Sequence, residues 1–81
     1  MNNTDTIFVL YEERETSELC GIRGAWKNKT VAIKNMELLI EQNNLYTEDS
    51  LVDYSDGYAQ SDPTYSEEVY SNYTITEINV N

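Results

Sequence analysis

Four segments of the chain carry hydrophobic patterns typical of regular structure, and the first two are strands. Residues 6–11 are β-branched or aromatic on both faces, which indicates a strand buried on at least one side. Residues 19–26 form a second apolar run, and its glycines indicate a bulge or a close approach of the helix backbone. The polar residues 12–18 form a hairpin loop or strands that extend past the core. The residues expected on one face of the second strand are Cys20, Ile22, Gly24 and Trp26.

The third segment is a helix that begins at Asn28 or Thr30, both of which are favourable N-cap residues. Its apolar positions follow the i, i+4, i+7 spacing of one buried stripe. We expect the helix to end near residues 43–44, because asparagine tolerates the left-handed conformation common at helix C-termini. The stripe consists of Ala32, Met36, Leu39 and Asn43, widened by Ile33 and Ile40.

The fourth segment, residues 68–80, alternates in the manner of a strand and is rich in β-forming residues. Residues 45–68, which precede it, contain too few apolar residues for a core helix and hold two turn signals. Asp56-Gly57 favours a mirror-image hairpin turn, and residues 61–64 form a second turn. The segment is either a long acidic excursion or a short irregular hairpin. In the last strand, Thr74, Thr76, Ile78 and Val80 alternate against Tyr73 and Ile75.

The order of strand, strand, helix, acidic segment and strand predicts an α+β fold. One helix packed on one face of a small, mostly antiparallel sheet is the economical two-layer solution for such a chain. We expect the last strand to lie beside the first. With 81 residues, the chain has room for one modest core, so residues 1–81 are expected to form a single domain.

The residue types that are absent exclude several classes of function. The chain has no histidine, and its single cysteine, Cys20, permits neither an intramolecular disulfide nor a Cys/His zinc site. We expect Cys20 to be a small buried hydrophobic residue. The first residues lack the pattern of a signal peptide, and no apolar run approaches the length of a membrane span. The chain is therefore interpreted as cytoplasmic, with no membrane contact.

The charge of the chain divides at Lys34. Residues 1–34 contain all five basic residues and five acids, so this part is neutral. Residues 35–81 contain ten acids and no base, so they carry the whole formal charge of −10. Such one-sided charge destabilises a compact state through self-repulsion and repels nucleic acid, so it indicates a function. We expect a positively charged protein partner, built to hold nucleic acid, and no direct binding of nucleic acid.

Carboxylates interleaved with tyrosines between residues 45 and 68 form the candidate site. Proteins contact the closely spaced phosphates of DNA with clefts of lysine and arginine. Carboxylates at comparable intervals present a similar field and accept bidentate arginine hydrogen bonds, and tyrosine rings add area for stacking. The alternative is a solvated loop that serves solubility. The predicted partner-binding residues are Glu48, Asp49, Asp53, Tyr54, Asp56, Tyr58, Asp62, Tyr65, Glu67 and Glu68.

Other interpretations of these residues are weaker. An EF-hand loop that starts at Asp53 needs glycine and glutamate where the chain has Tyr58 and Thr64, which leaves only a weak calcium site as an alternative. No second group stands out as a base, a nucleophile or a metal ligand, so we predict no enzyme, no catalytic residue, no metal and no cofactor. Trp26 is expected to close the core, with a binding hot spot as the alternative. The basic residues expected to form a solvated rim that pairs with Glu12, Glu13 or Glu15 are Arg23, Lys27, Lys29 and Lys34.

The acid-and-tyrosine part, mainly residues 45–77, resembles in composition the small acidic proteins of phages and mobile elements of low-GC bacteria. The anti-CRISPR proteins, antirestriction proteins and uracil-DNA glycosylase inhibitors of this kind include DNA mimics. The resemblance carries no diagnostic motif and no family residue. It implies an inhibitor that fills the nucleic-acid groove of a host defence enzyme, such as an RNA-guided nuclease. The alternative is a small adaptor domain that docks through its sheet edge or helix face, with acidity only for solubility.

Overall fold

The computed structural model describes residues 5–80 and has a small α+β fold, which confirms the predicted class. Residues 1–4 and 81 of the expected domain lie outside the described residues. The elements are, in chain order, strand β1 (Asp5–Arg14), the short 3₁₀ helix η1 (Ser17–Leu19), strand β2 (Gly21–Trp26), helix α1 (Lys29–Gln42), strand β3 (Leu51–Asp53), strand β4 (Tyr58–Gln60) and strand β5 (Ser71–Val80).

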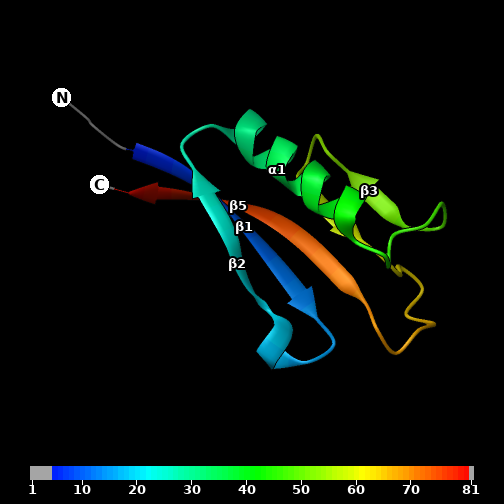
Figure 1. The fold of residues 1–81 in the computed structure, drawn as a ribbon. Helices are drawn as coiled ribbons and strands as arrows, with labels where there is room; N and C mark the ends of the chain where they lie inside the picture. The colour runs from blue at the N-terminus through cyan, green and yellow to red at the C-terminus, as the bar shows by residue number, and fades with distance from the viewer. Residues whose placement is uncertain (1–4, 81) are drawn as a thin grey trace.

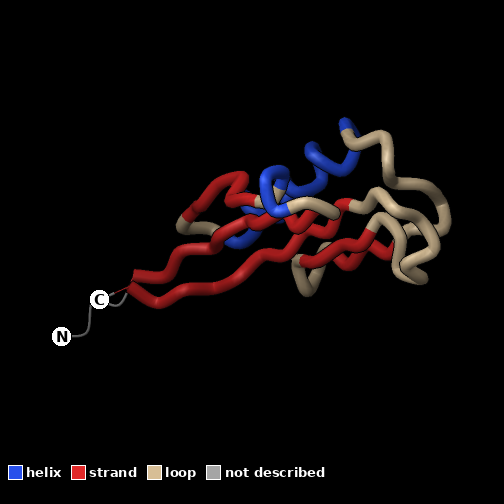
Figure 2. Tube along the Cα trace, turned by 90° about the horizontal axis from the view of Figure 1, so that it is seen from below, coloured by secondary structure: helices blue, strands red, loops and turns tan. Residues whose placement is uncertain are grey.

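The strands form one antiparallel sheet in the order β2-β1-β5-β4-β3. β1 and β5 pair along their whole length, from Asp5 opposite Val80 to Arg14 opposite Ser71, so the expected pairing of the first and last strands is confirmed. Helix α1 covers one face of this sheet, and within residues 5–80 no helix or strand covers the opposite face (Figures 1 and 2). We call that opposite side the open face.

The core lies between α1 and the centre of the sheet. Leu10 of β1, Met36 of α1, Ala59 of β4 and Tyr73 of β5 form the buried cluster, and Trp26 packs against it as predicted. The expected stripe of the helix is confirmed, because its buried residues belong to that stripe and Leu39 and Ile40 contact the cluster. The β-branched and aromatic residues of β1 and β5 therefore form strands because their alternate side chains fill this layer.

The caps of α1 confirm where the helix begins and ends, but not the backbone conformation predicted for its C-terminus. The side-chain oxygen of Asn28 accepts hydrogen bonds from the backbone N–H groups of Thr30 (2.8 Å) and Val31 (3.3 Å), so Asn28 is the N-cap. At the other end, Asn43 has an extended backbone (φ −93°, ψ 116°), so the expected left-handed conformation is wrong. Its amide group is used for tertiary hydrogen bonds instead.

A β-bulge in β2 corrects the predicted face of that strand. Leu10 pairs with Gly24, but the next residue of β1, Tyr11, pairs with Ile22, so Arg23 is the extra residue. Gly24 and Trp26 therefore face the helix, whereas Ile22 lies on the open face. A Cβ atom at Gly24 would clash with the Trp26 indole, so only glycine leaves room for the ring at this position.

The first strand is extended, as one of the two expected alternatives for the polar run 12–18 has it: β1 continues to Arg14, so three of the seven residues of that run are strand. The second strand begins later than expected, because Cys20 precedes β2 rather than belonging to it. Cys20 is half-buried, and its Sγ accepts a hydrogen bond from the backbone N–H of Arg14 (3.2 Å). The expectation of a wholly apolar, buried cysteine is therefore wrong.

The acidic segment contains the short hairpin β3–β4, which was one of the two expected alternatives. Its connection has four residues, 54–57, rather than the two central residues of a mirror-image hairpin turn, and Asp56 does not have the positive φ that a type I′ turn requires beside Gly57 (77°), so the expected mirror-image turn is wrong. The space beside Gly57 is closed, since an added Cβ would lie 3.0 Å from the Cβ of Ile75. The second expected turn is confirmed by the hydrogen bond from the N–H of Tyr65 to the carbonyl of Asp62 (3.1 Å).

Candidate functional site

Three connections lie together at one end of the elongated molecule, and we call residues 15–20, 43–50 and 61–70 the acidic end. They occupy the lower and right part of Figure 1, away from the strand ends at Asp5 and Val80, which we call the terminal end. The acidic end contains none of the five basic residues and seven of the fifteen acids. These seven acids are Glu15, Glu18, Glu48, Asp49, Asp62, Glu67 and Glu68.

Ser71, the first residue of β5, joins the connections of the acidic end through a buried network. Its hydroxyl accepts a hydrogen bond from the amide of Asn43 (2.9 Å), and its carbonyl accepts one from the hydroxyl of Tyr46 (2.7 Å). Its N–H donates to the hydroxyl of Ser61 (2.8 Å). Because Ser71 is fully buried, these bonds exchange little with water and hold the segments in fixed positions.

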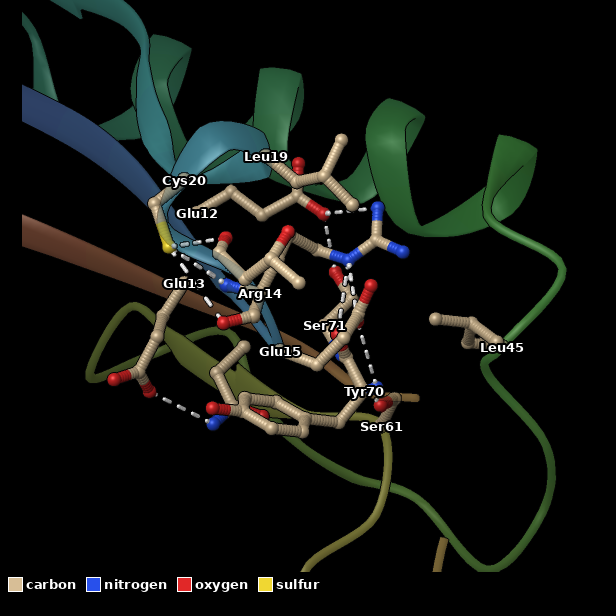
Figure 3. Close-up of polar contacts among 12 residues, drawn as sticks. Glu12, Glu13, Arg14, Glu15, Leu19, Cys20, Leu45, Ser61, Tyr70 and Ser71 are labelled. Carbon is tan, nitrogen blue, oxygen red and sulfur yellow. Dashed lines mark hydrogen bonds and ion pairs between the residues drawn. The ribbon is translucent and has the colours of Figure 1, made fainter. Parts of the chain in front are cut away.

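The two arginines belong to the same network and are paired with carboxylates. Arg23 Nε lies 2.9 Å from Glu12 Oε1. Arg14 lies 3.7 Å from Glu12 Oε2 and 3.4 Å from Glu15 Oε1 (Figure 3). Glu12 is only 6% exposed, and it also accepts a hydrogen bond from the hydroxyl of Ser71. The predicted pairing of Arg23 with Glu12 is confirmed, so the arginine charges are used within the fold.

A polar groove of about 1030 Å³ opens between residues 44–49 and 61–69. Four carboxylates, from Asp49, Asp62, Glu67 and Glu68, line it together with hydroxyl groups. The apolar lining residues are Leu45, Pro63 and Val69. The groove therefore has the composition of a surface that accepts cationic and hydrogen-bond-donating groups.

Asp62 organises the groove rather than only lining it. One carboxylate oxygen accepts hydrogen bonds from the hydroxyls of Thr64 (3.1 Å) and Ser66 (3.2 Å), and the other accepts one from the N–H of Glu67 (2.7 Å). The bond from that N–H, followed by those from the hydroxyls, lowers the pKa of Asp62. Asp62 is therefore a fixed negative charge that shapes the loop.

The structure divides the predicted site residues into two groups. Six of them, Glu48, Asp49, Asp62, Tyr65, Glu67 and Glu68, come together at the acidic end. The other acids, Asp53 and Asp56, belong to the β3–β4 connection with Tyr54, and Tyr58 begins β4 on the open face.

The hairpin group has its own local organisation. The Asp53 carboxylate accepts hydrogen bonds from the N–H of Asp56 (3.0 Å) and the hydroxyl of Ser55 (2.9 Å), and these bonds, in that order, lower the pKa of Asp53. Burial, followed by the nearby charges of Glu37 and Glu41 on α1, raises the pKa of Tyr54. The hairpin turn therefore lies beside the helix and not beside the groove.

The tyrosines of the candidate site are accessible. Tyr65 is 65% exposed, and Tyr54 and Tyr58 are each 37% exposed. The hydroxyl of Tyr65 accepts a hydrogen bond from Gln60 (3.3 Å), and the rings of Tyr65 and Tyr70 pack edge-to-face with 6.3 Å between their centres. These contacts hold an aromatic ring at the rim of the acidic end.

Sequence reasoning missed two acids of this end, Glu15 and Glu18, which belong to the connection between β1 and β2. Glu15 accepts a hydrogen bond from the N–H of Tyr70 (3.2 Å), so the first connection touches the third. Its own backbone N–H, followed by that of Tyr70 and by Arg14, lowers the pKa of Glu15. The expected pairing of the first and last strands contained the necessary signal, because it places the residue after β1 beside the residue before β5.

No group of three or more Cys, Asp or Glu side chains within residues 5–80 is arranged to hold a metal ion. Within the same residues, no helix is both long and apolar enough to cross a membrane. What the acidic end offers chemically is a set of fixed carboxylates with tyrosine hydroxyls and rings, which accept hydrogen bonds and cationic groups. Comparisons of the chain with protein-family models, with curated proteins and with solved structures found no match, so any assignment of function depends on the site's own charge and geometry.

Proposed function

We propose that this chain is a non-enzymatic inhibitor whose acidic end takes the place of DNA phosphates in the basic cleft of a nucleic-acid-binding protein. The observation that carries the proposal is the segregation of charge, with seven acids and no basic residue in the three connections at one end. The partner class is a bacterial defence or DNA-processing protein, such as a CRISPR nuclease, whose charged channel is empty before DNA arrives.

The length of the molecule supports a local effect of this charge. The molecule is 50 Å long, whereas charges are screened over about 8 Å at physiological ionic strength. Lys27 and Lys29, at the start of α1, therefore do not cancel the field of the acidic end. A cleft that approaches this end meets its seven carboxylates and none of the lysines, which favours fast, electrostatically steered association.

The hydrogen bonds at the acidic end also support mimicry, because a mimic of a rigid ligand needs charges in fixed positions. The buried bonds of Ser71 tie the acidic connections to the sheet, and Asp62 fixes the loop that carries Glu67 and Glu68. A pre-organised surface loses less conformational entropy on binding than a flexible acidic tail. The exposed ring of Tyr65 adds a face on which an arginine of the partner stacks.

The experiment is capture of DNA-binding proteins from a bacterial lysate with the immobilised chain, with and without competing duplex DNA. Capture is expected to fall with DNA and with rising salt. A variant with four charges removed from the acidic end is expected to lose at least about tenfold in capture. Its substitutions are Glu48→Gln, Asp49→Asn, Glu67→Gln and Glu68→Gln, which leave the loop-organising Asp62 in place.

A matched control removes four charges elsewhere, through Asp5→Asn, Glu37→Gln, Glu41→Gln and Glu77→Gln. It keeps the same net charge as the first variant and is expected to change capture by less than about twofold. Equal losses in the two variants would show that net charge, and not the acidic end, attracts the partner. Capture that salt and DNA leave unchanged would contradict mimicry altogether.

A small adaptor domain is the second candidate, and the outer side of α1 favours it. Val31 and Leu38 are 42% and 43% exposed, and they are seven residues apart on one side of the helix. A partner docked there buries both side chains without contact to the acidic end. In that case the four-charge variant of the acidic end retains its binding, and Leu38→Asp loses it.

A further inference from the structure

The open face of the sheet holds a buried hydrogen-bond acceptor for which the fold supplies no donor. Asn72 of β5 lies on this face, because its neighbour Tyr73 belongs to the core on the helix side and successive side chains of a strand alternate. Asn72 is only 9% exposed, although no helix or strand of residues 5–80 covers this face (Figure 2). Within the same residues, its Oδ1 is the buried side-chain atom that has no hydrogen-bond partner. A buried acceptor without a donor destabilises a folded protein, so it indicates a donor from outside the chain.

Glu13, which lies opposite Asn72 in the strand register, fixes the orientation of the amide group. Asn72 Nδ2 donates a hydrogen bond to Glu13 Oε1 (3.2 Å), which is the dashed line at Glu13 in Figure 3. The reverse orientation would place the amide oxygen against the carboxylate, so the atom without a partner is the acceptor. Whatever completes this site therefore supplies an N–H or O–H donor.

The charge of Glu13 narrows the donor to a cation. Glu13 is exposed, and none of the ion pairs among residues 5–80 involves it. The two arginines are held by Glu12 and Glu15 instead. A carboxylate without a cation beside a buried acceptor favours a ligand that is positively charged and donates several hydrogen bonds.

Tyrosine rings beside Glu13 narrow the cation to a guanidinium. Tyr11 lies on the same face of β1 as Glu13, and the ring of Tyr70 extends toward the Glu13 carboxylate (Figure 3). Burial, followed by the charge of Glu13, raises the pKa of Tyr70, in agreement with this proximity. The ring of Tyr65 packs against Tyr70 in turn. A planar guanidinium stacks on such rings and offers N–H donors in a fixed fork, whereas an ammonium is a compact, strongly hydrated charge.

We propose that Glu13 and Asn72 form a binding site for an arginine side chain of a partner protein. The guanidinium donates to the Glu13 carboxylate and to Asn72 Oδ1, and it stacks on the ring of Tyr70. Access needs only side-chain movement, because neighbouring side chains, and not a helix or strand, cover Asn72 on this face. Glu13 and Asn72 lie outside the acidic end, so this contact adds to the proposed attraction by charge and does not depend on it.

Titration of the isotopically labelled chain with N-acetylarginine amide, followed by NMR, tests the site. The side-chain amide signals of Asn72 and the backbone signals near Glu13 are expected to shift together and to saturate, with a dissociation constant of about 1–10 mM. N-acetyllysine amide carries the same charge and is expected to bind at least about threefold more weakly. Shifts that do not saturate, or equal affinities for the two compounds, would overturn the site.

Matched variants assign the contacts of the guanidinium. Glu13→Gln keeps an acceptor for Asn72 Nδ2 but removes the charge, and it is expected to weaken arginine binding at least about threefold. Glu68→Gln removes the same charge at the acidic end and is expected to change this affinity by less than about 1.5-fold. Asn72→Leu removes Oδ1 at similar volume and is expected to abolish the preference for arginine over lysine, with circular dichroism as the check on folding. Equal effects of Glu13→Gln and Glu68→Gln, or a preference that a folded Asn72→Leu variant retains, would contradict the assignment.

The same measurements separate this site from the proposed inhibition. The variant with four charges removed from the acidic end is expected to lose capture of DNA-binding proteins but to keep its affinity for N-acetylarginine amide within about twofold. Arginine binding without DNA-sensitive capture would support this site and overturn the inhibition. DNA-sensitive capture without arginine binding would overturn this site and leave the inhibition in place.

Discussion

The acidic end and the terminal end are built from the same two strands but are held by different interactions. At the acidic end, where β1 ends and β5 begins, both strands belong to a network of buried polar side chains centred on Glu12 and Ser71. At the terminal end, residues 5–7 of β1 pair only with residues 78–80 of β5, and the Thr6 hydroxyl donates to the side chain of Asn79 (3.0 Å). A two-stranded ribbon of this kind has little stability of its own.

This difference follows the distribution of charge. Seven carboxylates at one end repel one another, so the connections that carry them separate unless buried hydrogen bonds hold them. The network around Ser71 lies directly below these connections. The terminal end has balanced charge and needs no such support. The buried network around Ser71 and the seven carboxylates therefore occur at the same end of the molecule, which is the arrangement that a fixed electrostatic surface requires.

The substitution Glu12→Gln is the strongest test of whether the buried network stabilises the acidic end. It removes the charge that pairs with Arg23 and Arg14 and is expected to lower the free energy of unfolding by about 2 kcal/mol. This is below the usual cost of breaking a buried ion pair, because the arginine side chains are 32% and 22% exposed. Urea denaturation, followed by circular dichroism, measures the change.

Glu77→Gln at the terminal end is the control, since Glu77 is an exposed residue of β5. Its free energy of unfolding is expected to change by less than about 0.5 kcal/mol. Equal effects of the two substitutions would show that the network contributes no more to stability than an exposed carboxylate. The conclusion that the two ends are held differently would then be wrong.

Hydrogen exchange compares the local stability of the two ends at single amide groups. The ladder amides of residues 5–7 and 78–80 are expected to exchange at least about tenfold faster than those near Glu12 and Tyr73, because the ribbon opens without the core. Uniform protection along β1 and β5 would show that the ribbon is as stable as the acidic end.

Tyr46→Phe tests one bond of the network. It removes the hydroxyl that donates to the carbonyl of Ser71 and is expected to lower the free energy of unfolding by about 1 kcal/mol. The stacked contact with Tyr73, at 6.0 Å between ring centres, is retained. Tyr58→Phe, on the open face, is the control and is expected to have a smaller effect in the same urea titration.

The sequence predicts those parts of the fold that depend on hydrophobic periodicity. The helix from Lys29, its stripe through Met36, and the alternation of β5 follow from patterns that repeat over many residues. The glycines of residues 19–26 indicate a bulge as one alternative, but its position at Arg23 does not follow from the pattern, because one inserted residue reverses the faces of a strand while the apolar composition stays the same. The buried network is equally hidden, since Glu12 and Ser71 are polar residues that the pattern assigns to the surface.

The candidate site was predictable in composition but not in arrangement. Glu67, Glu68 and Asp49 come together because the expected acidic segment forms a hairpin whose two flanking loops meet. Asp53 and Asp56 are close to them in sequence but lie at the opposite end of that hairpin. Whether such a segment is a hairpin or an open loop depends on the packing of Ala59 against Tyr73, which local sequence signals do not specify.

The smallest expected effect concerns the pH dependence of the loop that Asp62 organises. The bond from the N–H of Glu67 and the hydroxyl bonds hold the pKa of Asp62 below its value in the unfolded chain, which is about 3.9. The stabilisation is therefore fully present above that value and is lost as pH falls through the lower, folded pKa. The difference in unfolding free energy between the natural chain and Asp62→Asn should stay constant from neutral pH to about pH 5 and narrow below about pH 4. Urea titrations at several pH values measure this difference in unfolding free energy.

A difference that stays the same at every pH would mean that the Asp62 carboxylate does not hold the loop, and the fixed position of Glu67 and Glu68 would lose its physical basis.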